Sequence, residues 1–517
     1  MSRRLQTLTL ALGLPCYLVL HALSFRRVPW GLEKGVAVEA LRGVRLVRHR
    51  VFEVLTFSIG PSAETLWLYL VGASVEFLGP GWLSVVLPSI LASCVVVALT
   101  TVLAARLFPR SPPYLAFLLS AGSVWLFHYG QVGLRAISAP VFLLLFTLLL
   151  DRTNVSREPD LSALLAGGVL GLSLYAYTSC RVLPLAYLAY AAWDGRRAQD
   201  RRGFFRGIAL TVAGAFLVSI PNFLFFMREP AEFLERGYYV FRGGLGPALV
   251  NLAGTLAFPF HYPDRYKVWL GEGHNFDPTS VSLVQGGVRP IDPVTALLFA
   301  AGLLGLGRPR SRTLSFLLCT FWMGVLPLGL SGPSLTRFLL LQPVYVLLAA
   351  GALGELHERL RRVRPLLVGA ALVPGALGAW EYVTEFGRSA TAQSEYDAAA
   401  SSMSARARDL LDRGERVMLV MRRGRDLVKL YTYRHIERVF LMEEVLGTVE
   451  TRGEALRRFQ PDAVLVERRP EFSPLVARLG APTASRAWYD EFHPQKTSGV
   501  GLPEPGNIQR LWNEIRR

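Results

Sequence analysis

The stretch LSVVLPSILASCVVVALTTVLAAR, residues 83–106, decides the fold class of this protein. It carries no charged side chain before its final arginine. A helix rises about 1.5 Å per residue and needs about 20 apolar residues to cross the hydrocarbon core of a bilayer. We therefore predict that this stretch is a transmembrane helix.

The composition of the whole chain indicates many such helices. Of its 517 residues, 51% are hydrophobic and only 18% are charged, which is unlike a soluble enzyme and typical of a polytopic membrane protein. The formal net charge of +17 is also found in nucleic-acid-binding proteins. Here, however, the basic residues form short clusters between apolar runs, where the positive-inside rule places them. We therefore predict no nucleic-acid partner.

Eleven apolar runs are long enough to span a bilayer once tilt is allowed for. They lie at residues 5–24, 83–106, 112–127, 138–150, 161–179, 182–194, 207–226, 293–307, 313–331, 337–354 and 365–383. The first run follows two arginines and resembles a signal peptide, but no small-x-small cleavage site follows it. We interpret it as an uncleaved transmembrane anchor.

Arginines mark alternate loops, and this alternation predicts the orientation of the chain. The arginine-rich segments carry Arg3, Arg4, Arg106, Arg110, Arg152, Arg157, Arg196, Arg197, Arg201, Arg202, Arg206, Arg308, Arg310, Arg312, Arg359, Arg361, Arg362 and Arg364. The short loops between them hold only Arg135, Arg181 and Arg337. By the positive-inside rule, the rich segments and the N-terminus are cytoplasmic. The predicted outer segments are residues 25–82, 228–292 and 384–517.

The run TLWLYLVGASVEFLG, residues 65–79, is apolar but only 15 residues long. If it spanned the membrane, every later arginine cluster would face the wrong side. We therefore expect a helix that dips into the membrane or lies on its surface and belongs to the first outer loop. That loop also carries seven basic residues, against the positive-inside rule, which suggests an anionic ligand or lipid headgroups.

The chain becomes typical of a soluble protein beyond Arg388. Short β-type runs at 416–424, 435–442 and 462–468 alternate with helical spacing in SARARDLLDRG, EALRRFQ and FSPLVARLG, which predicts a small α/β domain. No glycine-rich phosphate loop opens any of these helices, so we assign the domain no nucleotide. The predicted organisation is a transmembrane domain over 1–383, with outer loops 25–82 and 228–292, and an extracytoplasmic α/β domain over 384–517.

Polar residues at the outer ends of the predicted helices converge on one surface. The candidates are Glu33, Glu39, Glu64, Arg135, Tyr175, Tyr177, Arg181, Arg236, His274, Asn275 and Arg337. Arginines at membrane depth are costly and usually have a partner. Several arginines with a few carboxylates suit a phosphorylated lipid, because guanidinium groups bind phosphate and a carboxylate can accept a proton from a hydroxyl. The tyrosines either stack against a sugar or polyprenyl chain or belong to the aromatic belt of the interface.

A metal site is an alternative in the middle outer loop. His261, Asp264 and His274 are suitable ligand types, but their spacing within a loop is unspecific. We therefore predict no cofactor and do not favour a divalent metal ion.

Segments that carry these residues resemble a known family when taken in order. They are AETLWLYLVGASVEFLGPGWLSVVLPSIL, SVWLFHYGQVGLRAISAP, GLSLYAYTSCRVLP, PNFLFFMREPAEFLERG, GHNFDPTSVSLVQGGVRPIDPV and TRFLLLQPVYVLLAAGAL. They are similar to segments of bacterial GT-C glycosyltransferases of the family 39 type, which are related to the protein O-mannosyltransferases and the aminoarabinose transferases. The resemblance covers residues 30 to 354 and leaves the tail from 384 outside.

The resemblance implies an α-helical polytopic fold of about eleven transmembrane helices and a transferase of the bacterial inner (cytoplasmic) membrane. Its partners would be membrane lipids, a polyprenyl-phosphate-linked sugar as donor, and an extracytoplasmic protein, lipid or glycan as acceptor. Transfer would invert the anomeric carbon. Arg135, Arg181, Arg236 and Arg337 would then neutralise the phosphate of the donor.

The family places its base in an Asp-Glu pair of the first outer loop, and the matching pair here is Leu32-Glu33. Leucine cannot accept a proton, which leaves two hypotheses. In the first, Glu33, backed by Glu39 and Glu64, deprotonates or orients the acceptor hydroxyl, since a small helix rotation moves a carboxylate by several ångströms. In the second, the chain is a non-catalytic or transport protein that binds lipid-linked saccharides.

Overall fold

The computed structural model of the 517-residue chain describes most of the predicted transmembrane domain and part of the C-terminal domain. The described residues are 3–24, 31–32, 34–50, 52–56, 63–155, 158–230, 245–257, 291–305, 311–330, 335–384, 398–421, 425–432, 439–441, 462–468, 473, 482–486 and 489–492. The predictions for Glu33, Arg236, His274 and Asn275, and for the helical runs at 454–460 and 474–480, lie outside them.

The chain forms two compact units, each defined by the contacts among its own residues. The first comprises Met1–Val28, Arg50–Leu70 and Val86–Arg388. The second comprises Pro29–His49, Val71–Val85 and Ser389–Arg517. The second unit therefore contains two pieces of the predicted first outer loop together with the C-terminal segment.

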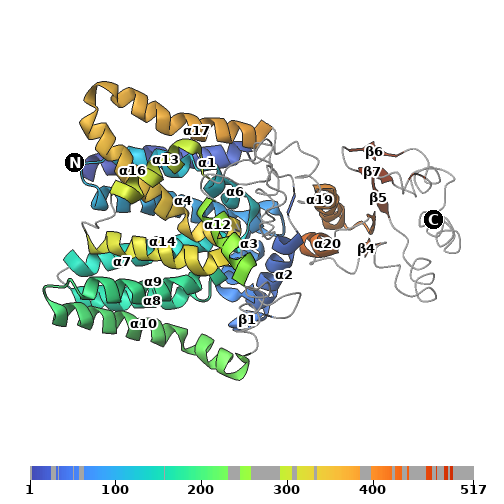
Figure 1. The fold of residues 1–517 in the computed structure, drawn as a ribbon. Helices are drawn as coiled ribbons and strands as arrows, with labels where there is room; N and C mark the ends of the chain where they lie inside the picture. The colour runs from blue at the N-terminus through green and yellow to red at the C-terminus, as the bar shows by residue number, and fades with distance from the viewer. Residues whose placement is uncertain are drawn as a thin grey trace. The chain divides into compact units, whose positions relative to one another are not determined.

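Helices build the first unit (Figure 1). In chain order they are α1 (Arg3–Ser24), α3 (Thr65–Leu78), α4 (Trp82–Leu107), α5 (Pro113–Ala121), α6 (Val124–Val132), α7 (Ser138–Val155), α8 (Pro159–Ser173), α9 (Val182–Gly195), α10 (Arg201–Arg228), α12 (Leu245–Ala257), α13 (Pro293–Gly305), α14 (Arg312–Leu330), α15 (Leu335–Phe338), α16 (Gln342–Arg359) and α17 (Arg364–Thr384). Two of these helices are shared with the second unit, which contains α3 from Val71 onward and α4 up to Val85. Short 3-10 turns precede several of them: η1 (Arg135–Ile137), η2 (Thr178–Arg181), η4 (Leu339–Leu341) and η5 (Arg361–Val363).

The prediction of a polytopic helical membrane fold is confirmed. In the described part of the chain, six helices are long and apolar enough to cross a membrane, and four shorter helices are apolar. The stretch 83–106 forms α4, which extends one residue beyond it at each end. The run 65–79 forms the shorter apolar helix α3.

Two helix boundaries differ from the prediction. The run 112–127 forms two helices rather than one, because α5 ends before Gly122 and Ser123 starts a new helix, α6. Ser123 Oγ caps α6 by accepting a hydrogen bond from Leu126 N at 3.3 Å, as short polar side chains do at helix N-termini. The run 161–179 ends early as α8, and η2 follows it.

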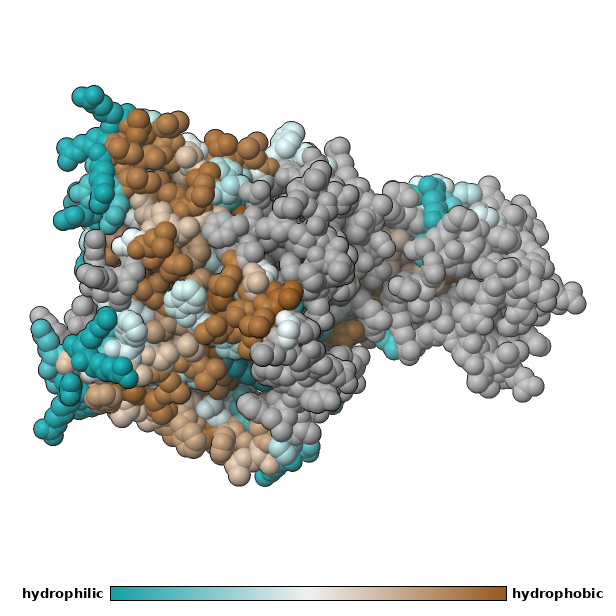
Figure 2. Space-filling view, in the orientation of Figure 1, coloured by the Kyte–Doolittle hydropathy of each residue, from teal (hydrophilic) through white to brown (hydrophobic). Residues whose placement is uncertain are grey.

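Helices α8 and α10 pack closely through glycine. A Cβ on Gly167 would lie 2.1 Å from the Thr211 carbonyl oxygen, and one on Gly214 would lie 2.5 Å from the Leu164 carbonyl oxygen. Both positions therefore require glycine, and such close packing drives the association of helices in lipid. Helix α10 also carries exposed apolar side chains, Phe216 among them, and Figure 2 shows apolar side chains over much of the helical surface.

Buried polar side chains join α1 to α4 and α6. The His21 ring lies 2.8 Å from Gln131 Nε2 and 3.2 Å from Ser93 Oγ. On α6, His128 Nδ1 lies 2.9 Å from the Tyr382 hydroxyl of α17. Polar groups without partners are costly in hydrocarbon, so these contacts fix one arrangement of the four helices.

The second unit contains an α/β sheet, as predicted for the C-terminal segment. Its strands are β3 (Val417–Val420), β4 (Val439–Leu441), β5 (Ala463–Glu467), β6 (Ala484–Ser485) and β7 (Tyr489–Phe492), in the order β4-β3-β5-β7-β6. Strand β3 pairs in parallel with β4 and β5, whereas β7 is antiparallel to β5 and β6. Among the described residues, the helices that lie wholly within this unit are α2 (Lys34–His49), α19 (Ala398–Asp412) and α20 (Arg425–Thr432).

Pieces of the predicted first outer loop are tied to the C-terminal segment within this unit. The buried backbone N–H of Leu32 donates to Ser401 Oγ at 3.1 Å. Arg408 Nη1 donates to the Pro80 carbonyl oxygen, and α2 packs against α20. The second unit is therefore a single body built from three separate parts of the sequence.

Candidate functional site

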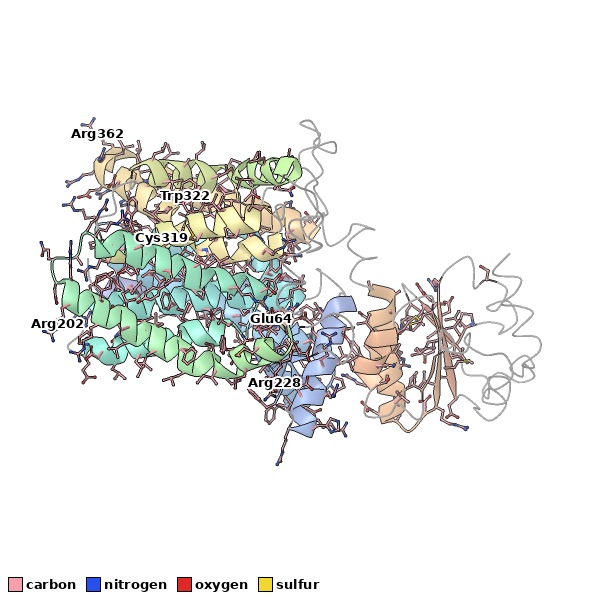
Figure 3. The ribbon with its side chains drawn as sticks, turned by 60° about the horizontal axis from the view of Figure 1, so that its bottom comes forward. Glu64, Arg202, Arg228, Cys319, Trp322 and Arg362 are labelled. Atoms are coloured by element: carbon pink, nitrogen blue, oxygen red, sulfur yellow. The ribbon has the colours of Figure 1, made fainter. Side chains whose placement is uncertain are left out.

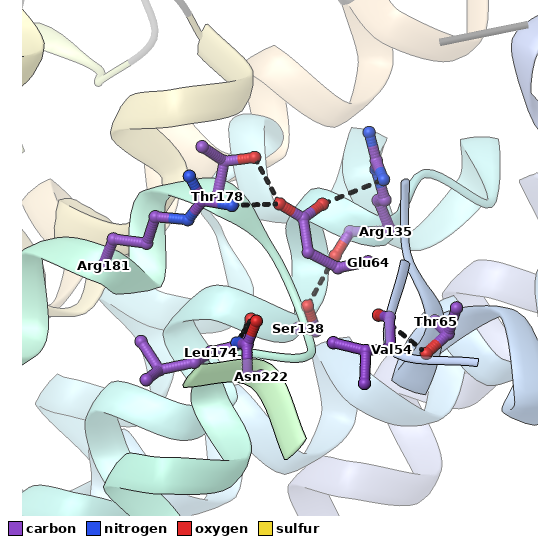
Figure 4. A network of polar contacts seen from close by, with 9 residues as sticks. All are labelled: Val54, Glu64, Thr65, Arg135, Ser138, Leu174, Thr178, Arg181 and Asn222. Atoms are coloured by element: carbon purple, nitrogen blue, oxygen red, sulfur yellow. Dashed lines mark hydrogen bonds and ion pairs between the residues drawn. The ribbon is translucent and has the colours of Figure 1, made fainter. Parts of the chain in front are cut away.

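Glu64 receives contacts from three side chains, shown in Figure 4. Glu64 Oε2 accepts a hydrogen bond from Arg135 Nη1 at 3.0 Å, and Glu64 Oε1 accepts one from Thr178 Oγ1 at 2.7 Å. Arg181 Nη2 lies 3.6 Å from Oε1 and completes a second ion pair. We call these four residues and Tyr177 the Glu64 cluster. The Glu64 side chain is only 1% exposed, whereas those of Arg135 and Arg181 are 17% and 24% exposed.

Local hydrogen bonds hold Glu64 in place. It ends the short strand β2 (Ala63–Glu64), which pairs antiparallel with β1 (Leu55–Thr56). Directly after it, Thr65 Oγ1 donates to the Glu53 carbonyl oxygen at 2.6 Å. The next backbone N–H, of Leu66, donates to the Tyr175 carbonyl oxygen at 3.0 Å. The backbone on both sides of Glu64 is thus held by contacts that do not involve the Glu64 side chain.

Short 3-10 turns present the two arginines to Glu64. Arg135 begins η1 and Arg181 ends η2, and each turn leads into a helix. Side chains three residues apart lie on the same side of a 3-10 turn, which brings Thr178 and Arg181 to the same carboxylate oxygen. Before η1, Gly133 ends α6 with φ of 80°. This left-handed conformation favours glycine and turns the chain from α6 into η1.

Tyr177 and Arg337 lie near the arginines that contact Glu64. The Arg135 guanidinium carbon is 5.6 Å from the centroid of the Tyr177 ring, within the range of a cation–π contact. Tyr177 lies beside Thr336 and Arg337, and α15 contacts η2. The structure therefore brings together five of the residues predicted from sequence: Glu64, Arg135, Tyr177, Arg181 and Arg337.

The chemistry of the Glu64 cluster suits an anion. A guanidinium group carries a positive charge, five N–H donors and no acceptor, so Arg135, Arg181 and Glu64 together carry a formal charge of +1. A buried carboxylate also keeps both guanidinium groups in position, because either group would lose a charged partner in a low-dielectric environment if it moved away. Guanidinium groups bind phosphate through paired hydrogen bonds.

Tyr175 lies two residues from Tyr177 but contacts α10. Its hydroxyl donates to the Val218 carbonyl oxygen at 3.0 Å and accepts a hydrogen bond from Asn222 N at 3.2 Å. These two groups flank Pro221, which has no N–H and interrupts the hydrogen bonds of a helix. The Tyr175 hydroxyl therefore supports α10, and contact of its ring with a substrate stays a prediction.

Glu39, the other predicted carboxylate that the structure describes, belongs to the second unit. Glu39 is half-buried on α2. Leu32, which the sequence resemblance matches to an aspartate, is 0% exposed and is held to Ser401 through its backbone. Glu33 lies outside the described residues, so the roles of Glu33 and Glu39 as bases stay predictions. Arg236, His274 and Asn275 also lie outside them, and their roles in binding the substrate stay predictions too.

Two contacts of the site were missed by sequence reasoning. Thr178 donates to Glu64, and its position three residues before Arg181 was the available signal. The Phe226 ring lies 5.4 Å from the Arg181 guanidinium carbon. Nothing distinguishes Phe226 from its phenylalanine neighbours in PNFLFFM.

A metal site was also considered. Within the described ranges, no group of three or more histidine, cysteine, aspartate or glutamate side chains is arranged to hold a metal ion. His261, Asp264 and His274 lie outside those ranges.

Solved structures match almost the whole chain. ArnT from Cupriavidus metallidurans matches with a TM-score of 0.54 in its apo state and 0.55 when bound to undecaprenyl phosphate, at 12% and 11% sequence identity. These matches cover 95% and 96% of this chain and 98% and 99% of ArnT. The archaeal oligosaccharyltransferase AglB from Archaeoglobus fulgidus, in complex with an inhibitory peptide and a dolichol-phosphate, matches with a TM-score of 0.52 at 12% identity, over 88% of this chain and 69% of AglB.

ArnT, an aminoarabinose transferase, and AglB are both membrane glycosyltransferases of the GT-C superfamily. At these identities the similarity establishes the fold, so the predicted GT-C-like fold is confirmed. No protein-family model and no curated protein sequence matches the chain.

Proposed function

We propose that the chain is a membrane glycosyltransferase that takes its sugar from a polyprenyl-phosphate-linked donor. The observation that carries this proposal is the Glu64 cluster, in which a buried carboxylate holds Arg135 and Arg181 at 3.0 and 3.6 Å. Two proteins of the same fold support it, since ArnT was solved with undecaprenyl phosphate and AglB with a dolichol-phosphate. The acceptor would be an extracytoplasmic protein, lipid or glycan.

Arginines suit the charge that develops in this reaction. The acceptor hydroxyl attacks the anomeric carbon, its proton passes to a base, and the bond from that carbon to the phosphate oxygen breaks. The leaving polyprenyl phosphate gains one negative charge as the diester becomes a monoester. Guanidinium groups therefore bind the departing phosphate more strongly than the donor, which lowers the barrier as well as fixing the donor. We assign this role to Arg135, Arg181 and Arg337, with Arg236 as a further phosphate ligand.

Glu64 orients the arginines in this proposal. Its two carboxylate oxygens already accept hydrogen bonds from Arg135 and Thr178, so taking a proton from an acceptor would weaken the contacts that hold the site. We assign the base to Glu33, backed by Glu39. Inversion follows from a single displacement at the anomeric carbon.

Transfer from a radiolabelled polyprenyl-phosphate sugar by the reconstituted full chain tests the proposal. Arg181→Lys replaces a planar fork of donors by a single ammonium group. We expect kcat/KM to fall about ten- to hundred-fold, which corresponds to about 1.4–2.7 kcal/mol of transition-state stabilisation. Arg362→Lys is the control, because Figure 3 places this exposed arginine at the end of the helices away from Glu64. Full activity in Arg181→Lys would contradict a role for Arg181 in binding the phosphate of the donor.

The second candidate is a chain that binds a lipid-linked saccharide without transferring sugar, as a non-catalytic or transport protein. Leu32 favours it, because a fully buried leucine at the position of the family's aspartate cannot accept a proton. Binding of polyprenyl phosphate that depends on Arg181, without transfer from any donor, would establish this alternative.

A further inference from the structure

A cavity of about 430 Å³ lies between the ends of α7, α8, α9, α10 and α14. Figure 3 shows Arg202, near the start of α10, at one end of the helices, and Glu64 toward the other. The cavity contains residues of the first turns of α10, so it lies at the arginine-rich end and is separate from the Glu64 cluster. Its volume is in the range of small-ligand sites, about 300–1,000 Å³.

The charged groups around this cavity balance one another. Of the described residues that line it, two are arginines, Arg206 and Arg312, and two are aspartates, Asp160 and Asp200. Asp160 forms an ion pair with Arg206, and Asp200 Oδ1 accepts a hydrogen bond from Gly203 N at 2.9 Å. The lining therefore has no net formal charge, although the surrounding loops are strongly basic.

Aromatic rings form the apolar wall of the cavity. The rings of Tyr187 and Tyr190 are stacked with centroids 5.8 Å apart, and Phe204 lies 5.9 Å from Tyr190. The Arg312 guanidinium carbon lies 5.2 Å from the Phe204 centroid. Charged and aromatic surfaces thus meet inside one cavity, as an amphiphilic ligand requires.

The helices around the cavity also carry exposed apolar side chains. Leu161 and Leu165 of α8 are 50% and 51% exposed, and Phe205 of α10 is 52% exposed. We expect these side chains to contact lipid, which would place the cavity near the boundary between hydrocarbon and headgroups. Basic pockets between transmembrane helices at this level bind anionic headgroups, so a pocket with balanced charge would suit a headgroup that is neutral overall.

We propose that this cavity binds the headgroup of a zwitterionic phospholipid. Arg312 and Arg206 would contact the phosphate, Asp160 and Asp200 would lie near the ammonium group, and the aromatic wall would contact the glycerol backbone. The balanced charge of the lining favours an ethanolamine headgroup, which is neutral overall, over a glycerol headgroup, which is anionic. This site is independent of the proposed transfer reaction.

Gly207→Leu places a bulky side chain in the cavity while sparing the helix. Gly207 lines the cavity, and a Cβ built on it meets no atom within 4 Å. Leucine also favours a helix more than glycine does, by somewhat under about 1 kcal/mol. Gly369→Leu on α17 is the matched control, because a Cβ there also meets no atom within 4 Å and Gly369 does not line the cavity.

Native mass spectrometry of the purified full chain, titrated with dioleoylphosphatidylethanolamine or dioleoylphosphatidylglycerol, measures the binding. We expect at least about a ten-fold preference of the native chain for the ethanolamine lipid, and at least about a ten-fold loss of its affinity in Gly207→Leu but not in Gly369→Leu. Asp160→Asn, which removes one carboxylate, is expected to shift the preference toward the glycerol lipid. Equal affinity for the two lipids, unchanged binding in Gly207→Leu, or an equal loss in the control would overturn the proposal.

Discussion

Glu64→Gln separates the stability of the Glu64 cluster from its affinity for phosphate. The substitution keeps the shape of the side chain and removes its charge. In the native chain the carboxylate is 1% exposed and contacts Arg135 at 3.0 Å and Arg181 at 3.6 Å. Removing one partner of a buried ion pair typically costs about 3–5 kcal/mol, because the remaining charge is poorly solvated. We therefore expect the free energy of unfolding to fall by about 3–5 kcal/mol.

Undecaprenyl phosphate should restore part of this loss, since its phosphate supplies the negative charge that the glutamine lacks. A ligand present at 100 times its Kd stabilises the folded state by about 2.7 kcal/mol. Because the phosphate is expected to bind the variant more tightly, its stabilising effect should be larger in Glu64→Gln than in the native chain. Denaturant unfolding of the purified chain in detergent, with and without the lipid, measures both quantities.

Glu355→Gln is the matched control. Glu355 lies 3.8 Å from Arg359 on α16, and the two side chains are 44% and 77% exposed. Exposed helical pairs of this kind contribute about 0.3–0.5 kcal/mol, so this variant should unfold almost as the native chain does. The reasoning would be refuted if Glu64→Gln were as stable as Glu355→Gln, or if undecaprenyl phosphate stabilised it less than it stabilises the native chain.

Three further variants probe other parts of the structure. Gly133→Ala places a side chain at φ of 80°, which should destabilise the chain by about 1–2 kcal/mol and shift Arg135, so donor affinity measured by lipid titration should fall as well. Ser401→Ala removes the acceptor of a buried backbone N–H in the second unit and should cost about 1–3 kcal/mol in denaturant unfolding. The Arg468 guanidinium, hydrogen-bonded to Asp490, lowers the pKa of that carboxyl. The ionised Asp490 carboxylate therefore stabilises the fold above the unfolded pKa of about 3.9, and this stability is lost as pH falls through the folded pKa. Asp490→Asn should therefore be less stable than the native chain at pH 7 and should show a flatter loss of unfolding free energy in acid.

The helical architecture was largely predictable from the sequence. Apolar runs such as 83–106 fix helices by length and composition alone, and the order of the family-like segments was enough to predict the fold at identities near 12%. The division of 112–127 was not predicted, because an apolar pattern does not show that Ser123 caps a new helix. Residues 34–49 have the pattern of an amphipathic helix, but that pattern does not show that the helix joins the C-terminal segment in one unit.

The candidate site was predictable by position but not by pairing. Glu64, Arg135 and Arg181 were expected on one surface because each lies at a predicted outer helix end. Their partners could not be assigned, since the contacts of Glu64 join residues 71 and 114 positions apart and depend on how η1 and η2 fold. The burial of Leu32 against Ser401 likewise depends on tertiary packing.

A structure of the full chain with undecaprenyl phosphate bound would test the central claim most directly. We predict phosphate oxygens about 2.7–2.9 Å from guanidinium nitrogens of Arg135 or Arg181, with Glu64 still between the two side chains. A phosphate bound elsewhere, with neither arginine in contact with it, would contradict the account.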